Sequence, residues 1–331
     1  MISVHLRSLA VLLLCSSAIV AGEPSPYRSK EAWQRAVPKN YQRRAEFAFV
    51  EADPRLPNVL IIGDSNSMRY TVGVRDRLKG TANVFRAPDN CRSTRQTLQQ
   101  IEIYLGHLRW DVIHFNWGMH DLTHLNDAGT AAPPPAGKLQ VPPDRYEQNL
   151  RKLIERLKKT KARLIWATTT PVGRKTEERG FRRDCDVVDY NAIAAEVMKA
   201  SGVEVNDLYT LTKPRAEQLL SDGVHFNKAG QKLVAKTVAA AIRKQLWLWS
   251  IDSKDRPSGK WRRECRLLDR QGAFYRDADG FHPAGAVIDE QRGVQHIFIY
   301  SGHPNGPAGV FRITRTLDTP KLAAFLTGLK P

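Results

Sequence analysis

The stretch that decides the fold reads Asn58-Val59-Leu60-Ile61-Ile62-Gly63-Asp64-Ser65-Asn66-Ser67. Its apolar run, residues 59–62, is rich in β-branched side chains and ends at a glycine, which is typical of a strand buried on both faces. Ser65 then lies where this strand becomes a helix, because apolar residues recur at helical spacing after it (Met68, Val72, Leu78). Sites in open α/β sheets form at the carboxyl ends of strands, so Ser65 is a candidate nucleophile. A serine that merely caps the helix would show the same local pattern.

Strands alternate with helices along the residues that follow, which predicts an α/β fold with a mostly parallel five-stranded sheet between two helical layers. The later strands are expected at residues 83–86, 110–116, 163–171 and 203–205. Helices are expected around Leu98 to Leu105 and at residues 146–159, 188–201 and 228–247, with Asp144 and Gly202 as caps. Residues 128–143 are rich in Ala, Gly and Pro, which predicts a mobile loop.

The two ends of the chain differ from this pattern. Residues 1–22 hold Arg7, an apolar run and then small residues, as a secretory signal peptide does, so we expect a secreted or periplasmic protein. Residues 23–57 are predicted to be an N-terminal extension with one helix near 30–36, and residues 58–250 the main domain. Residues 251–331 are predicted to be a β-rich appendage of unknown role, with strands at 296–300 and 309–313 and a short helix at 321–329.

The chain carries a formal net charge of +17, with Lys and Arg spread along its whole length. No helix-turn-helix, RNA-binding or zinc-finger signature accompanies these charges, so we expect no nucleic-acid partner. A basic surface that makes peripheral contact with anionic envelope polysaccharide or lipid headgroups is the better interpretation.

Export would permit a disulfide bond. The mature chain would keep Cys91, Cys185 and Cys265, which allow three single pairs and always leave one cysteine over. Cys91 and Cys185 both follow predicted strands on the same edge of the sheet. We therefore predict that these two pair, with Cys265 as the alternative partner of either.

Four short motifs lie at predicted strand ends: Gly63-Asp64-Ser65, Asn90-Cys91-Arg92, Gly118-Met119-His120-Asp121 and Asp222-Gly223-Val224-His225. Their order and spacing resemble the SGNH (GDSL-type) hydrolase family over about residues 58–242, which implies a flavodoxin-like three-layer α/β/α sandwich. The resemblance also implies that Ser65 is the nucleophile, His225 the general base and Asp222 its orienting acid. The chemistry agrees, since a serine hydroxyl needs an imidazole to take its proton and the imidazole needs a carboxylate on its other nitrogen.

Two motifs depart from the family pattern. Where the family has a glycine whose N–H binds the oxyanion, this chain has Asn90-Cys91-Arg92, so Arg92, or Cys91 in reserve, would supply that N–H beside the N–H of Ser65. The family's third motif, Gly-x-Asn-Asp, contains His120 in place of the asparagine. An imidazole N–H can also donate to an oxyanion, and Asn116 is the reserve donor.

The histidines could suggest a metal centre, because His120 and His124 are four residues apart, with His114 and His225 in addition. No Glu or Cys accompanies them in the order typical of zinc sites. We therefore predict neither a metal nor another cofactor.

These observations predict an exported serine esterase that acts on a small-molecule or glycan ester through an acyl-serine intermediate. The sequence contains no long apolar segment that could bind an acyl chain, which favours a short acyl group such as acetyl on a carbohydrate. Two alternatives stay open: a lipid or lysophospholipid ester hydrolase, and a non-catalytic scaffold of this family that binds glycans.

Overall fold

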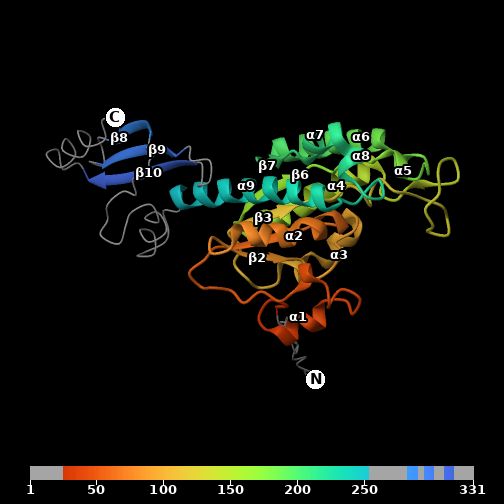
Figure 1. The fold of residues 1–331 in the computed structure, drawn as a ribbon, viewed down its shortest axis with the longest axis horizontal. Helices are drawn as coiled ribbons and strands as arrows, with labels where there is room; N and C mark the ends of the chain where they lie inside the picture. Colours follow the sequence, from red (N-terminus) through yellow and green to blue (C-terminus); the bar gives the residue numbers. More distant parts are fainter. Residues whose placement is uncertain (1–24, 253–281, 290–293, 302–308, 317–331) are drawn as a thin grey trace, which may run out of the picture.

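The computed structural model describes residues 25–252, 282–289, 294–301 and 309–316 (Figure 1). Its main domain is built on a five-stranded sheet with the strand order β2-β1-β3-β6-β7, in which all neighbours are parallel. The strands are β1 (Asn58–Ile62), β2 (Asn83–Arg86), β3 (Val112–Phe115), β6 (Arg163–Ala167) and β7 (Glu204–Asn206). The predicted sheet is therefore confirmed.

The apolar run of β1 is buried on both faces, as its composition predicted. Leu60 and Ile62 face one hydrophobic core, Val59 and Ile61 face the other, and all four side chains are fully buried. The core of Val59 and Ile61 is closed by α2 (Ser65–Leu78) and α9 (Lys228–Asp252). The opposite core is closed by α3 (Thr94–Leu105), α4 (Pro143–Lys158) and α6 (Asp184–Ser201). This is the predicted three-layer α/β/α arrangement.

Several element boundaries differ from the prediction. Pro142 precedes the first turn of α4, so Asp144 lies inside that turn and is not the N-cap. Helix α6 starts at Asp184, four residues before the predicted 188, and ends as predicted at Gly202, whose φ of 64° is left-handed. In α2 the side chain of Val72 is 36% exposed, and Val74 takes the buried position instead.

Short elements in the loops were not predicted. Residues 128–143 include β5 (Lys138–Leu139), which pairs antiparallel with β4 (His124–Leu125), so this segment is partly regular. The other unpredicted elements are α5 (Arg174–Glu177), α7 (Leu208–Thr212), α8 (Ala216–Leu219) and the 3₁₀ turns Ala45–Phe47 and Lys213–Arg215.

The N-terminal extension packs on the edge of the sheet near β2. Helix α1 (Lys30–Ala36) matches the prediction, and its buried Trp33 donates a hydrogen bond to the carbonyl of Phe47. The ring of Tyr27 packs against Phe85 of β2 and against Trp110. The extension therefore contributes to the same hydrophobic core as α3 and α4.

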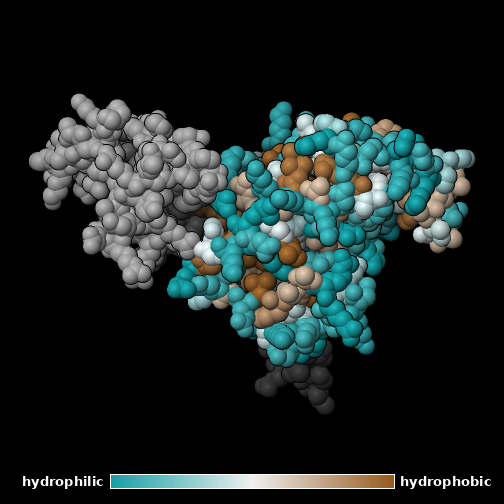
Figure 2. Space-filling model, in the orientation of Figure 1, coloured by the Kyte–Doolittle hydropathy of each residue, from teal (hydrophilic) through white to brown (hydrophobic). Residues whose placement is uncertain are grey.

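Beyond α9 the structure describes one antiparallel sheet, with β9 (Val294–Ser301) between β8 (His282–Asp289) and β10 (Gly309–Thr316). The two predicted strands are thus confirmed with longer bounds, and β8 is an addition. The predicted signal peptide, the helix at 321–329 and Cys265 lie outside the described residues. Among the helices of the described residues, none combines the length and the apolar character that crossing a bilayer requires. The face drawn in Figure 2 is mostly hydrophilic, with its hydrophobic groups in small separate patches.

Candidate active site

Ser65 is the first residue of α2, directly after the central strand. Asp64 is the N-cap, and its carboxylate accepts a hydrogen bond of 2.9 Å from the backbone N–H of Asn66. The Ser67 hydroxyl donates to the carbonyl of Asp64 at 2.6 Å, which tightens the turn. A Cβ at Gly63 would lie 3.0 Å from the Cβ of Ser67, so this close packing favours glycine there. The strand-to-helix turn thus holds Ser65 at the carboxyl edge of the sheet.

Three side chains form a continuous hydrogen-bonded chain at this edge. The hydroxyl oxygen of Ser65 is 2.7 Å from Nε2 of His225, across a separation of 160 residues. Nδ1 of the same imidazole is 2.7 Å from Oδ2 of Asp222. This is the order of nucleophile, base and orienting acid that the sequence predicted.

Asp222 is held in its charged form although part of its side chain is withdrawn from water. Burial raises the pKa of Asp222. Its carboxylate also accepts hydrogen bonds from the backbone N–H and the imidazole of His225 and from the backbone N–H of Val224. Together these bonds hold the pKa of Asp222 well below its ordinary value. The turn needs Gly223, whose φ is 87° and where a Cβ would meet the backbone N of Thr176 at 2.8 Å. A charged Asp222 can stabilise the imidazolium that forms when His225 takes a proton.

His120 lies on the loop after β3. Its pKa is lowered to about 4, mainly by burial and also by the charges of Arg182, Arg92 and His225, while the charge of Asp64 opposes the shift. The imidazole is therefore neutral at neutral pH, with one N–H available to donate. The groups whose charges act on the pKa of His120 thus include His225 and Asp64 of the candidate site.

The second motif adopts a backbone conformation that glycine would normally take. Arg92 has a φ of 50°, in the left-handed region that side chains disfavour. Its N–H donates to the side-chain oxygen of Asn90 at 3.1 Å, and the N–H of Cys91 donates to the carbonyl of Gly63 at 3.3 Å. Each candidate N–H of this loop thus has an intramolecular acceptor, whereas no hydrogen bond of the Ser65 N–H is found within the described residues.

Asp121 joins the second and third motifs. Its buried carboxylate accepts hydrogen bonds from both the N–H and the hydroxyl of Thr94, the first residue of α3. Burial raises the pKa of Asp121 to about 7, against the lowering effect of these bonds. The carboxyl group therefore ties the loop of His120 to the loop of Arg92.

A model of the GDSL-like lipase/acylhydrolase family matches residues 62–233, which include all four motifs. The chain belongs to this family. Similar solved structures include an acetyl xylan esterase, with 19% identity over 56% of this chain and 99% of its own, at a TM-score of 0.48. A lipase/acylhydrolase from Enterococcus faecalis shares 18% identity over 56% of this chain and 95% of its own, at 0.46. A GDSL-like lipase from Bacteroides thetaiotaomicron shares 17% over 62% and 96%, at 0.47. No curated protein matches the chain.

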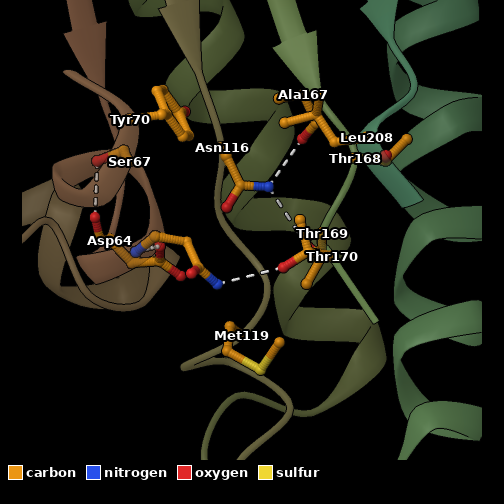
Figure 3. A pocket seen from close by; sticks show the side chains of 11 residues that line it. Asp64, Ser67, Tyr70, Asn116, Met119, Ala167, Thr168, Thr169, Thr170 and Leu208 are labelled. Atoms are coloured by element: carbon orange, nitrogen blue, oxygen red, sulfur yellow. Dashed lines mark hydrogen bonds between the residues drawn. The ribbon is translucent and has the colours of Figure 1, made fainter. Parts of the chain in front are cut away.

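Asn116, which precedes the third motif by two residues, was predicted as the reserve donor to the oxyanion. Its amide nitrogen donates to the carbonyl of Ala167 at 2.7 Å and approaches the hydroxyl of Thr169 at 3.4 Å (Figure 3). Asn116 lines a small cavity behind the nucleophile turn, beside Ser67 and Tyr70. Its donors are thus used inside the sheet, which favours His120 as the donor to the oxyanion.

The predicted disulfide between Cys91 and Cys185 is wrong, because both cysteines are free thiols. Cys91 is fully buried under the second motif, where burial raises its pKa to about 12. Cys185 lies exposed in the first turn of α6. Cys265, the predicted alternative partner of either, lies outside the described residues.

The remaining histidines have structural surroundings. His114 is buried in β3 with Nε2 3.2 Å from the side-chain nitrogen of Asn206, and burial lowers its pKa to about 3. Nδ1 of His124 is 3.8 Å from a carboxylate oxygen of Asp186. Among the described residues, no group of three or more His, Cys, Asp or Glu side chains could hold a metal ion.

Sequence reasoning missed two residues of the site. The buried side chain of Asn66 bridges the nucleophile turn to the histidine loop, and its position directly after Ser65 was the only signal. Arg182, in the loop between α5 and α6, acts on the pKa of His120 although nothing in its sequence neighbourhood marks it. Both depend on contacts between segments that are far apart in the chain.

Proposed function

We propose that this member of the GDSL-like lipase/acylhydrolase family is a serine ester hydrolase that works through an acyl-serine intermediate. The observation that carries the proposal is the chain of 2.7 Å contacts from Ser65 to His225 and from His225 to Asp222. In it the serine hydroxyl can pass its proton to the base, and a charged carboxylate stabilises the base when it becomes positive.

In acylation the oxygen of Ser65 attacks the ester carbonyl while Nε2 of His225 takes the hydroxyl proton. The carbonyl oxygen becomes an oxyanion, for which the N–H groups of Ser65 and of the neutral His120 imidazole are the proposed donors. Arg92 could contribute its N–H if the bond to Asn90 is exchanged for one to the oxyanion. Collapse of the tetrahedral intermediate breaks the ester bond, and His225 gives its proton to the leaving alcohol.

In deacylation a water molecule takes the place of the alcohol. His225 removes a proton from this water as it attacks the acyl-serine, and the second tetrahedral intermediate uses the same oxyanion donors. Its collapse releases the carboxylic acid and returns the proton to Ser65. No step requires a metal or cofactor.

The proposed substrate carries a short acyl group, such as acetyl on a carbohydrate. Polar and charged groups support this choice: Asp222 is hydrogen bonded to His225, and Arg92 and Arg182 act electrostatically on His120. Such surroundings suit a hydrated sugar alcohol better than a long acyl chain, which needs apolar surface. The signal-peptide pattern of residues 1–22 supports the further proposal that the protein is exported, and N-terminal sequencing of the mature protein tests it.

Hydrolysis of 4-nitrophenyl esters of increasing chain length tests the function. Wild-type protein should turn over the acetate faster than the decanoate, and Ser65→Ala should lose several orders of magnitude in kcat with its fold intact. Faster turnover of the decanoate would favour a lipid esterase. Equal activity of Ser65→Ala and wild type would contradict the mechanism, and no turnover by wild type would favour a glycan-binding scaffold.

A further inference from the structure

Arg182 has an unusual place for an arginine. It is partly buried, and burial lowers its pKa while the charges of Asp64 and Asp222 raise it. Its Nε donates to the hydroxyl of Thr123 at 2.8 Å, and this is the only hydrogen bond that its guanidinium makes within the described residues. It has no ion pair there either. Its two terminal nitrogens thus have no acceptor within the described residues, and neither is fully withdrawn from solvent, so both are available to a ligand.

Arg86 shows how this chain satisfies a buried guanidinium that needs no ligand. Arg86 is fully buried, and its nitrogens donate to the carbonyls of Ala87 and Asp89 and approach the hydroxyls of Ser67 and Thr71. All three of its nitrogens therefore have acceptors. Arg182 differs because only its Nε is engaged, which leaves the outer edge of its guanidinium open.

The segment that carries α5 and Arg182 is hydrogen bonded to two loops of the candidate active site. The N–H of His124 donates to the carbonyl of Phe181 at 2.8 Å, and the N–H of Thr123 donates to the carbonyl of His120 at 3.2 Å. On the other side of α5, the N–H of Gly173 donates to the carbonyl of Gly223, between Asp222 and His225. Arg182 therefore has a defined position next to the oxyanion donor.

The charges near Arg182 do not neutralise it by direct contact. The carboxylate of Asp64 caps α2, and that of Asp222 is hydrogen bonded to His225 and its backbone. Arg92 on the neighbouring loop is exposed and adds a second positive charge that acts on His120. Two arginines thus act electrostatically on His120, the proposed donor to the oxyanion.

We propose that Arg182, with Arg92 beside it, forms a subsite for a carboxylate on the substrate, so that the ester hydrolysed is an acyl group on a carboxylate-bearing sugar. The proposal rests on the proposed esterase function and names its substrate class. A guanidinium whose outer edge is free matches the planar geometry of a carboxylate with two parallel hydrogen bonds. The net charge of +17 acts in the same direction, because it attracts an acidic polysaccharide to the protein.

Paired esters that differ only in charge test the subsite: 3-acetoxybenzoate against 3-acetoxybenzamide, and the corresponding 4-acetoxy pair. Wild type should prefer the carboxylate in kcat/KM for at least one pair. Arg182→Gln should reduce that preference by on the order of 10- to 100-fold, mainly through KM, because a charge-assisted pair is lost. Arg182→Lys should restore part of it, since it returns the charge without the planar edge.

Arg183→Gln is the matched control, since it removes the same charge from the adjacent residue. The guanidinium of Arg183 already pairs with Asp186, at 2.6 Å and 2.8 Å, so the preference should not change. An equal loss on both esters in Arg182→Gln would overturn the proposal in favour of an oxyanion or folding role. Absence of any preference in wild type would overturn it as well.

A binding measurement separates failure of the subsite from failure of the esterase. Titration calorimetry with Ser65→Ala should detect trigalacturonate binding that weakens 10- to 100-fold when Arg182→Gln is added. If no ester is hydrolysed but this dependence is found, the subsite stands and the esterase proposal fails. Binding of trigalacturonate that does not depend on Arg182, or no binding at all, would overturn the subsite.

Discussion

The side chain of Asn66 holds the backbone of Val224 next to the nucleophile turn. Its amide nitrogen donates to the carbonyl of Val224 at 3.1 Å and to the hydroxyl of Thr170 at 3.2 Å. Val224 is the residue before His225, and Asn66 is the residue after Ser65. One buried amide thus connects the residue after the nucleophile to the residue before the base, and so helps to fix the distance between Ser65 and His225.

Asn66→Ala should therefore impair catalysis without touching the reacting groups. The carbonyl of Val224 loses its donor, so the histidine loop can move away from Ser65, and a small displacement there costs about 10²-fold in kcat. Loss of a buried hydrogen-bonding side chain should also lower the free energy of unfolding by ~1–3 kcal/mol. Kinetics and thermal unfolding check both effects. A kcat within twofold of wild type would show that other contacts hold the loop.

Arg92 provides a test of backbone strain. A non-glycine residue in the left-handed region is disfavoured by about 1–2 kcal/mol, whereas glycine is not. Arg92→Gly relieves this strain but gains freedom in the unfolded chain, so its stability should stay within about 1 kcal/mol of wild type. Arg92→Val removes the same charge but adds a branched Cβ, and it should be clearly less stable. Equal melting temperatures of the two variants would argue against the strained conformation.

The buried Asp121 predicts a pH dependence of stability. Its pKa in the folded state is raised to about 7, whereas a free Asp carboxyl has a pKa of about 4. Between these two pH values the folded state therefore binds more protons than the unfolded state. Stability contributed by this group is therefore present at low pH and is lost as pH rises toward 7. Asp121→Asn removes that loss, so its melting temperature relative to wild type should rise between pH 5 and 8.

Asp144→Asn controls for the removal of a surface carboxylate, since Asp144 is well exposed in the first turn of α4. A difference in melting temperature between Asp121→Asn and wild type that stays constant with pH would contradict the raised pKa of Asp121.

The sequence sufficed to predict the sheet from local patterns, and the family resemblance of its motifs predicted the hydrogen-bonded chain of Ser65, His225 and Asp222. An apolar run rich in β-branched residues before Gly63 is typical of a central strand, and the spacing of Asp222 and His225 already permits their hydrogen bond. The start of α6 was missed because Asp184 and Asp186 make the segment look like a polar loop. In the structure both carboxylates are buried, and Tyr209, Lys213 and Arg183 satisfy them.

The rest of the site could not be predicted because it depends on contacts between distant segments. Whether Asn116 or His120 faces the nucleophile depends on Ala167, whose carbonyl occupies the Asn116 amide from the next strand. The thiol of Cys91 is buried while Cys185 lies in a helix, and no sequence spacing reveals either fact. The location of Arg182 beside the loop of His120 depends on its hydrogen bond to Thr123, which the sequence does not indicate.

His120 provides the sharpest test of the proposed chemistry. Its pKa of about 4 keeps the imidazole neutral, so it can donate one hydrogen bond to the oxyanion and need not transfer a proton. Removing one such donor typically lowers kcat by ~10²–10³-fold, less than loss of the nucleophile. His120→Ala should therefore be impaired but active, and His120→Asn should recover part of the loss because its amide restores an N–H. Steady-state kinetics of both variants on 4-nitrophenyl acetate decide this. The same loss in both, or no loss in either, would move the donor role away from His120 and leave the oxyanion to the N–H of Ser65 and the loop of Arg92.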